Sequence, residues 1–137
     1  MGAPYLHELR VRYGECDPQG IVFNANYLLY YDVAFTELWR EAIGPWSVMN
    51  ERGVDVVVAE ASLRFLAPAR YDDVLALSIG VERLGASSIA TSWQLRREDD
   101  LLVEGGMRHV CVDAATWRSP RAAAPSLRCR DGSAPPA

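Results

Sequence analysis

The sequence predicts an α+β fold in which one long helix packs across one face of a five-stranded antiparallel sheet. Three observations support this prediction: the chain opens with strand-like alternation, one helical stripe of apolar residues follows, and the rest alternates with a period of two. Because turn residues, not a second long helix, separate the later segments, neighbouring strands should run antiparallel. With 137 residues, half of them hydrophobic, the chain can build one core, and the helix must cover one face of the sheet.

The first elements are a strand over residues 5–13 and the long helix. The segment GECDPQG between them is rich in turn residues. Asn24 or Asn26 is expected to cap the helix, and Gly44-Pro45 to end it, which gives roughly 18–20 residues and about 30 Å. Its apolar stripe comprises Tyr27, Tyr31, Ala34, Phe35, Leu38 and Ala42.

Four strands are predicted after the helix. The inward faces of the first three are Val57, Ala59, Ala61, Leu63, Phe65 and Ala67; then Leu75, Leu77, Ile79 and Val81; then Ile89, Thr91, Trp93 and Leu95. Turns are expected at Gly85-Ala86 and Asp99-Asp100, and a bulge at Gly105-Gly106 in the last strand. Residues 1–118 would thus form the domain, and 119–137, rich in Pro, Ala and Arg, a disordered tail.

Composition excludes several classes of function. All 14 basic residues are arginine, so no mechanism can use a lysine Schiff base, a lysine base or a Walker-type phosphate loop. The net charge of −4 argues against a nucleic-acid partner. Three scattered cysteines and two histidines fit neither a disulfide framework nor a metal site, and we expect no cofactor. No apolar run could span a membrane or serve as a signal peptide, so a cytoplasmic location is expected.

The polar residues with the clearest chemistry lie just before the helix, around Asp17. A helix start offers unpaired N–H groups and the positive end of a dipole. Asp17 beside such donors could attack an acyl carbon or direct water, while the N–H groups hold an oxyanion. The alternative is that Asp17-Pro18 only forms a turn and caps backbone amides. Glu60, His109 and Cys16 are weaker candidates, because a strand acid, a packed histidine and a cysteine without a neighbouring histidine are common structural residues.

At this point the sequence resembles a known family. The segment RVRYGECDPQGIVFNANYLLYYD is similar to the opening of hotdog-fold acyl-CoA thioesterases of the 4-hydroxybenzoyl-CoA thioesterase type, with Asp-x-x-Gly, a hydrophobic pair and Asn-Tyr on the central helix. The later segment ERGVDVVVAEASLRFLAPARYDDVL resembles the family's next strand and connection. The resemblance covers roughly residues 5–117. Ile21 stands where many relatives carry histidine, which favours the branch that includes the hydroxybenzoyl enzymes.

The resemblance implies a set of site residues. Asp17 matches the catalytic carboxylate, as nucleophile or general base, and the N–H of Asn24 matches the group that polarises the thioester carbonyl. Gly20 would let the backbone pass close to the substrate. Asp32 and Trp46 match an acid and a tryptophan that contact an aromatic acyl group, although Trp46 aligns only with a one-residue gap. Apart from the resemblance, the place of Tyr27 in the helix stripe favours packing between helix and sheet over an acyl pocket. A residue can do both, so Tyr27 is also a candidate for substrate binding.

The family also implies partners. We expect a homodimer with sheets joined edge to edge, or a homotetramer, with active sites between subunits and acyl-CoA as substrate. The CoA phosphates need arginines, and the candidates are Arg64, Arg83, Arg96 and Arg97. Two alternatives stay open: a thioesterase acting on an acyl carrier protein, and a non-catalytic hotdog module that binds acyl-CoA. No nucleic-acid or membrane partner is expected.

Overall fold

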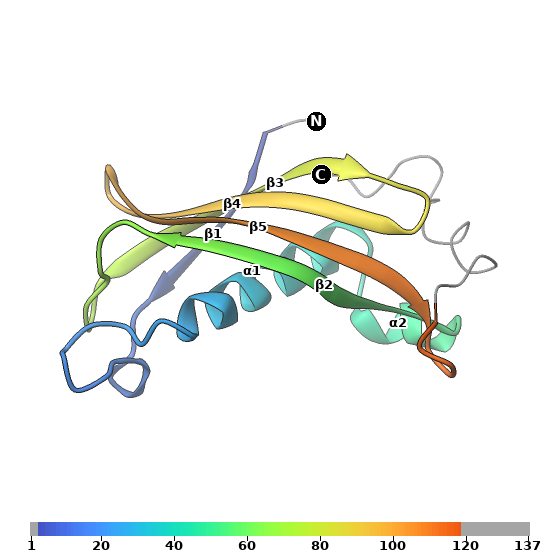
Figure 1. Ribbon diagram of the computed structural model, residues 1–137, viewed down its shortest axis with the longest axis horizontal. Helices are drawn as coiled ribbons and strands as arrows, with labels where there is room; N and C mark the ends of the chain where they lie inside the picture. Colours follow the sequence, from blue (N-terminus) through green and yellow to red (C-terminus); the bar gives the residue numbers. More distant parts are fainter. Residues whose placement is uncertain (1–2, 119–137) are drawn as a thin grey trace.

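In the computed structural model, which describes residues 3–118, five strands form one antiparallel sheet, and a long helix lies across one of its faces (Figure 1). The sheet confirms the predicted architecture, and residues 119–137, the predicted tail, lie outside the described residues. The sheet order is β1-β3-β4-β5-β2, so β1 and β2 are its edges. The elements are β1 (Tyr5–Arg10), the short 3₁₀ helix η1 (Tyr13–Glu15), α1 (Asn26–Ala42), α2 (Trp46–Glu51), β2 (Val54–Phe65), β3 (Val74–Leu84), β4 (Ser88–Arg97) and β5 (Asp100–Asp113).

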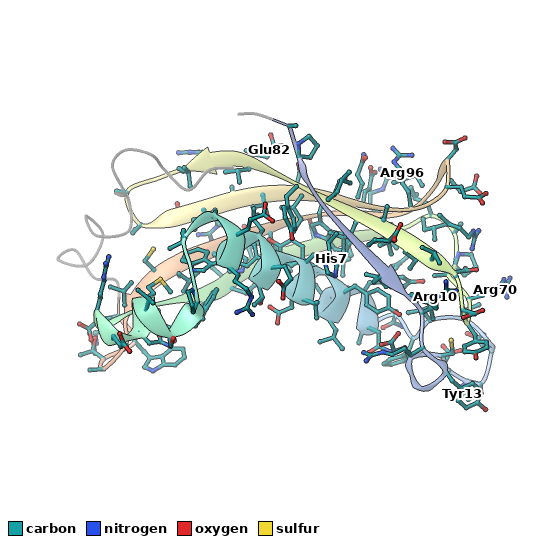
Figure 2. The ribbon with its side chains drawn as sticks, turned by 180° about the vertical axis from the view of Figure 1, so that it is seen from behind. His7, Arg10, Tyr13, Arg70, Glu82 and Arg96 are labelled. Atoms are coloured by element: carbon teal, nitrogen blue, oxygen red, sulfur yellow. The ribbon has the colours of Figure 1, made fainter. Side chains whose placement is uncertain are left out.

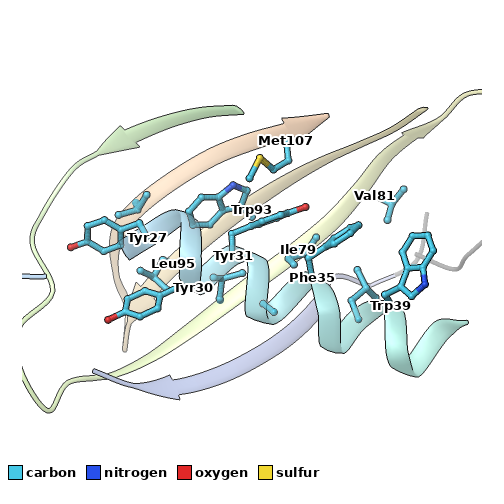
Figure 3. Close-up of a cluster of buried hydrophobic side chains, with 14 of the residues drawn as sticks. Tyr27, Tyr30, Tyr31, Phe35, Trp39, Ile79, Val81, Trp93, Leu95 and Met107 are labelled. Carbon is cyan, nitrogen blue, oxygen red and sulfur yellow. The ribbon is translucent and has the colours of Figure 1, made fainter. Parts of the chain in front are cut away.

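The core fills the space between α1 and the concave face of the sheet (Figure 3). Five of the six residues in the predicted helix stripe are buried, and Tyr30 and Trp39 join them. The predicted inward faces of β3 and β4 are confirmed, since their members are at most 7% exposed. The inward faces of β3 and β4, together with the aromatic face of α1, therefore form most of the core.

The start of α1 differs from the prediction. Ala25 occupies the N-cap position without a side-chain hydrogen bond, and Asn26 is the first helical residue. The Asn26 side chain instead donates to the carbonyl oxygen of Glu15 at 2.8 Å, which ties the helix to the preceding loop. The β1 strand also stops at Arg10, before the predicted end, because η1 begins three residues later. The short helix α2 was not predicted, since six residues carry too little periodicity to indicate a helix.

The bulge predicted at Gly105-Gly106 and the face predicted for β2 were both wrong. The β2–β5 register shifts between Val58 and Glu60, so Ala59 is an extra residue. Side chains before and after such an insertion change faces, so Val57 does not share a face with Phe65 as predicted. Gly105 and Gly106, by contrast, pair regularly with both neighbouring strands.

Candidate active site

A pocket of about 340 Å³ lies between the loop that precedes α1 and the end of β2. Hydrogen bonds hold these two segments together: Val22 N donates to the Ala69 carbonyl oxygen at 2.9 Å, and Ile21 forms an isolated β-bridge with Arg70. Of the predicted site residues, Asp17, Asn24 and Tyr27 line this one pocket. The lining is Asp17, Gln19, Ile21, Val22, Asn24, Tyr27, Phe65, Leu66, Ala67 and Pro68.

Asp17 sits in a tight turn and lines the pocket. Its Oδ1 accepts a hydrogen bond from Gln19 N at 2.9 Å, and its carbonyl oxygen accepts one from Gly20 N at 2.8 Å. Gly20 adopts φ +82°, a left-handed conformation that favours glycine, although it is not in the pocket lining. The turn interpretation is therefore correct for one carboxylate oxygen, and within residues 3–118 Oδ2 has no hydrogen-bond partner.

The backbone just before α1 offers unpaired donors, and one of the residues that carries them, Asn24, lines the same pocket. The N–H groups of Asn26, Tyr27 and Leu28 each donate to a carbonyl three residues earlier. The N–H groups of Asn24 and Ala25 have no acceptor anywhere in the part of the chain that the structure describes. A carboxylate and a free N–H group at one pocket are the two groups that acyl transfer needs.

Glu15, which sequence reasoning did not single out, holds this loop in place. It is buried, its Oε1 accepts from the Tyr30 hydroxyl at 2.8 Å and from Arg12 N at 2.8 Å, and its carbonyl accepts from Phe23 N at 3.0 Å. Burial alone would raise the pKa of this carboxyl, but the hydrogen bonds from Arg12 and Tyr30 outweigh burial and lower the pKa. An ionised Glu15 therefore ties the loop carrying Asp17 to the core face of α1.

Tyr27 connects the pocket to the core. Its ring is buried against Phe65, with ring centroids 5.7 Å apart, and its hydroxyl accepts a hydrogen bond from Ala69 N at 3.1 Å. Burial raises the pKa of the Tyr27 hydroxyl, so it stays neutral. Tyr27 and Phe65 thus form an aromatic wall of the pocket, and the interpretation of Tyr27 as both packing and pocket residue fits this position.

Asp32 and Trp46 lie outside the pocket of a single chain. Asp32 is exposed on α1. Trp46 begins α2, where its ring packs on Trp39 with centroids 5.0 Å apart and its Nε1 donates to Asp55 at 3.2 Å. Contact of either residue with substrate stays a prediction.

The four arginines suggested for phosphate binding are dispersed. Arg64 pairs with Glu104 at 2.7 Å on the sheet face opposite α1, and Arg83 lies near the end of β3. Arg96 donates to Gln94 at 3.1 Å. Arg97 is the one near the pocket, since it donates to the Pro68 carbonyl oxygen at 3.2 Å and pairs with Asp73 at 2.8 Å.

A larger hollow of about 710 Å³ crosses the outer face of the sheet and is not the candidate site. The charged side chains named here already have partners within the protein: Arg64 pairs with Glu104, and Glu82 accepts a hydrogen bond from the Ser92 hydroxyl at 2.6 Å. Over residues 3–118, no group of three or more metal-ligating side chains occurs, and no helix is long and apolar enough to cross a membrane.

His109 lies in the core under α1 and not in the pocket. Its ring stacks on Phe35, with centroids 4.3 Å and planes 6° apart, and it is 3% exposed. Burial lowers the pKa of His109 to about 4. A neutral imidazole away from the pocket does not fit a general base for chemistry at Asp17.

The His109 pKa predicts a pH-dependent stability. The unfolded chain should bind this proton near pH 6.5 and the folded chain only near pH 4, so the free energy of unfolding should fall by about 1.4 kcal/mol per pH unit on acidification between these values. Chemical denaturation at several pH values between 6 and 5 measures this slope. The variant His109→Leu should have a shallower slope over the same interval, and an equal slope would contradict the role of His109.

A sheet that wraps around one helix, and a pocket lined by a carboxylate residue and a residue with a free N–H group, together define a protein of the acyl-transfer class. The family model for the thioesterase superfamily matches residues 19–104. The acyl-CoA thioester hydrolase YbgC of Escherichia coli is 34% identical over 121 residues, which cover 87% of this chain and 89% of that protein. The chain therefore belongs to the thioesterase superfamily and is a thioester hydrolase with the hotdog fold.

A solved structure and a more distant relative complete the comparison. The crystal structure of a hypothetical protein from Thermus thermophilus is 30% identical, with a TM-score of 0.79, covering 90% of this chain and 96% of that one. The 4-hydroxybenzoyl-CoA thioesterase of a Pseudomonas species is 35% identical, but over only 71 residues, half of each chain. Similarity to the hydroxybenzoyl type is thus partial, and the comparisons show membership of the thioesterase superfamily without identifying this type.

Proposed function

We propose that this protein hydrolyses acyl-CoA thioesters to the free acid and CoA. The observation that carries the proposal is the shared pocket of the Asp17 carboxylate and the unpaired N–H of Asn24. The chain is similar over most of its length to a protein named as an acyl-CoA thioester hydrolase, and this similarity supports CoA as the thiol part of the substrate. The expected cytoplasmic location stays a prediction.

In the proposed reaction, the Asn24 N–H donates to the thioester carbonyl oxygen and stabilises negative charge on it. Asp17 then either attacks the carbonyl carbon and expels the CoA thiolate, or takes a proton from a water that attacks instead. In the first route, water cleaves the resulting acyl-aspartyl anhydride and restores the carboxylate. Thiolate is a good leaving group, so neither route needs a histidine to activate the leaving group.

An aromatic acyl group such as 4-hydroxybenzoyl is the finer proposal. The aromatic wall of Tyr27 and Phe65 supports it, because flat rings stack favourably on such walls. Asp32 and Trp46 lie outside this pocket, so in this proposal they would contact the acyl group across a subunit interface.

A panel of thioesters tests the proposal and its alternatives. Release of free thiol from 4-hydroxybenzoyl-CoA, butyryl-CoA and a butyryl-acyl carrier protein should be fastest for the aromatic CoA ester. A faster reaction with the carrier-linked ester would favour the carrier-protein alternative. Binding of all three without release of thiol would favour a non-catalytic module and would contradict the proposed reaction.

A homodimer formed through β2 is part of the proposal. β2 is a 12-residue edge strand, and Val58 and Phe65 on it are 49% and 54% exposed. Long apolar edge strands pair readily with a second copy. Because β2 ends at the pocket, such a pairing would also cover the aromatic wall.

The dimer is checked by the variant Val58→Arg, which places a charge on this edge. Sedimentation velocity should give at least twice the 15.2 kDa chain mass for the wild type and a smaller species for the variant. A wild-type protein that sediments as a single chain at assay concentration would contradict the dimer.

A further inference from the structure

An exposed aromatic and basic cluster lies beside the pocket and has no role in the proposed chemistry. The rings of Tyr13 and Tyr71 meet edge to face, with centroids 5.9 Å apart and planes at 87°. They are 80% and 58% exposed, although large aromatic side chains are normally buried. A T-shaped contact leaves ring faces open to solvent, so the pair offers a stacking surface for a flat ligand.

Arginines surround this pair. Arg10 ends β1, Arg12 directly precedes Tyr13, and Arg70 directly precedes Tyr71. Figure 2 shows Arg10, Tyr13 and Arg70 at one end of the molecule. Arg10 and Arg12 pair with Asp72 and Glu15, respectively. The Arg70 guanidinium has no hydrogen bond or ion pair with any residue in 3–118, so it is free to bind an anion. Arg70 therefore gives the cluster an uncompensated positive charge, in a chain whose net charge is −4.

The cluster is held rigidly at the edge of the pocket. Two backbone hydrogen bonds join Val11 to the loop between β2 and β3. The Val11 carbonyl oxygen accepts from Asp72 N at 3.1 Å, and Val11 N donates to the Asp73 carbonyl oxygen at 2.9 Å. The β-bridge between Ile21 and Arg70 connects the cluster to the pocket, because Ile21 lines it. A surface fixed in this way loses little conformational entropy when it binds a ligand.

We propose that Tyr13, Tyr71 and Arg70 bind the nucleotide end of CoA, with the adenine stacked on the tyrosines and a phosphate on Arg70. The inference rests on the proposed function. With the thioester at Asp17, the pantetheine arm leads out of the pocket and carries the phosphates and adenine to its rim. Adenine stacks on aromatic rings, and guanidinium binds phosphate in a bidentate manner. Both partners that the nucleotide needs are therefore present at the rim.

The test compares two substrates with the same acyl group, acyl-CoA and acyl-pantetheine, because only the first carries the nucleotide. Arg70→Gln should lower kcat/KM for acyl-CoA about tenfold, and Tyr71→Leu and Tyr13→Leu by a similar factor. None of them should change kcat/KM for acyl-pantetheine. Arg52→Gln, which removes an exposed arginine at the end of α2, is the matched control and should change neither value.

Two outcomes would overturn the inference. Equal losses on both substrates would mean that the cluster supports the loop and not the nucleotide, and no loss on either would mean that CoA leaves the pocket elsewhere. Arg83→Gln should leave the ratio unchanged, and a selective loss there would place the phosphates at the other end of β3.

Failure of the proposed function is recognised separately. It would show as a wild type that hydrolyses neither thioester. In that case calorimetric titration with CoA itself still tests the cluster: Arg70→Gln should weaken binding about tenfold relative to wild type, and equal affinity would contradict the inference.

Discussion

Replacing Asp17 by Asn should lower kcat for acyl-CoA hydrolysis by roughly 10³-fold or more, while the protein still folds and binds acyl-CoA. An amide is isosteric with the carboxylate and can still accept the hydrogen bond from Gln19 N, so the turn should persist. The amide is, however, a poor nucleophile and no base. The loss should therefore appear in turnover and not in affinity. Thiol release under saturating substrate measures it.

Asp99→Asn is the matched control for this prediction. It makes the same chemical change at an exposed carboxylate in the β4–β5 turn and should leave turnover unchanged. An Asp17→Asn enzyme that keeps its rate within tenfold of wild type would contradict the catalytic role. The residue would then be a turn former, as the hydrogen bond to Gln19 alone would suggest.

Isotope labelling separates the two proposed routes. In a single turnover in water labelled with oxygen-18, cleavage of an acyl-aspartyl anhydride can leave label in the Asp17 carboxylate, whereas general-base catalysis places it only in the acid product. Mass spectrometry of the peptide that contains Asp17 reads this directly. Label in the peptide requires the anhydride, because general-base catalysis puts no solvent oxygen into Asp17.

The parts of the fold predicted correctly are those in which periodicity is long and unbroken. The helix stripe and the inward faces of β3 and β4 each repeat over several turns or pleats, and burial of one face fixes the phase. The faces of β2 could not be predicted, because the extra residue Ala59 has an ordinary strand side chain and leaves no signal in the sequence. The prediction of the helix cap failed for a different reason. The Asn26 side chain donates a hydrogen bond to the Glu15 carbonyl oxygen, 11 residues away in sequence, and does not cap the helix.

The candidate site shows the same division. Asp17 and Asn24 could be proposed because they are close in sequence and belong to one motif. Phe65 and Pro68 reach the same pocket only through tertiary structure, from the end of β2 and the loop after it. Glu15 was overlooked because its role depends on Tyr30, which lies nearly one turn of α1 beyond the pocket residue Tyr27. A local motif thus locates the reactive groups, while the walls and supports of the site come from chain segments distant in sequence.

Gly105 is another residue whose role depends on a segment distant in sequence. It is conspicuous in the sequence, but the neighbouring strand β2 determines why a glycine is needed there. A Cβ at Gly105 would overlap the Ser62 carbonyl oxygen and lie 2.8 Å from Nε1 of Trp93, which is only 2% exposed. Neither neighbour can yield easily, because one is backbone in β2 and the other fills the core. The glycine is thus needed for close packing and not for a bulge.

Gly105→Ala should therefore destabilise the protein by about 3 kcal/mol, near the upper end of the cost of overpacking a core. Gly106→Ala is the matched control, on the same strand and with the same added methyl group. Its Cβ would lie 3.3 Å from the Ser62 hydroxyl oxygen, a side-chain atom that can rotate away. Because glycine weakens strands, this second change should be neutral or stabilising by up to about 1 kcal/mol. Denaturant midpoints at fixed pH measure both.

Trp93→Leu in the Gly105→Ala background separates the two clashes. Removing the indole should recover part of the lost stability, so the double-mutant cycle should show a favourable coupling of about 1 kcal/mol, while the clash with the Ser62 carbonyl remains. If Gly105→Ala and Gly106→Ala behave alike, β2 and β5 can separate at this position without cost. That result would contradict the close approach of the two strands, and with it the packing of Trp93 on which the core beneath the sheet depends.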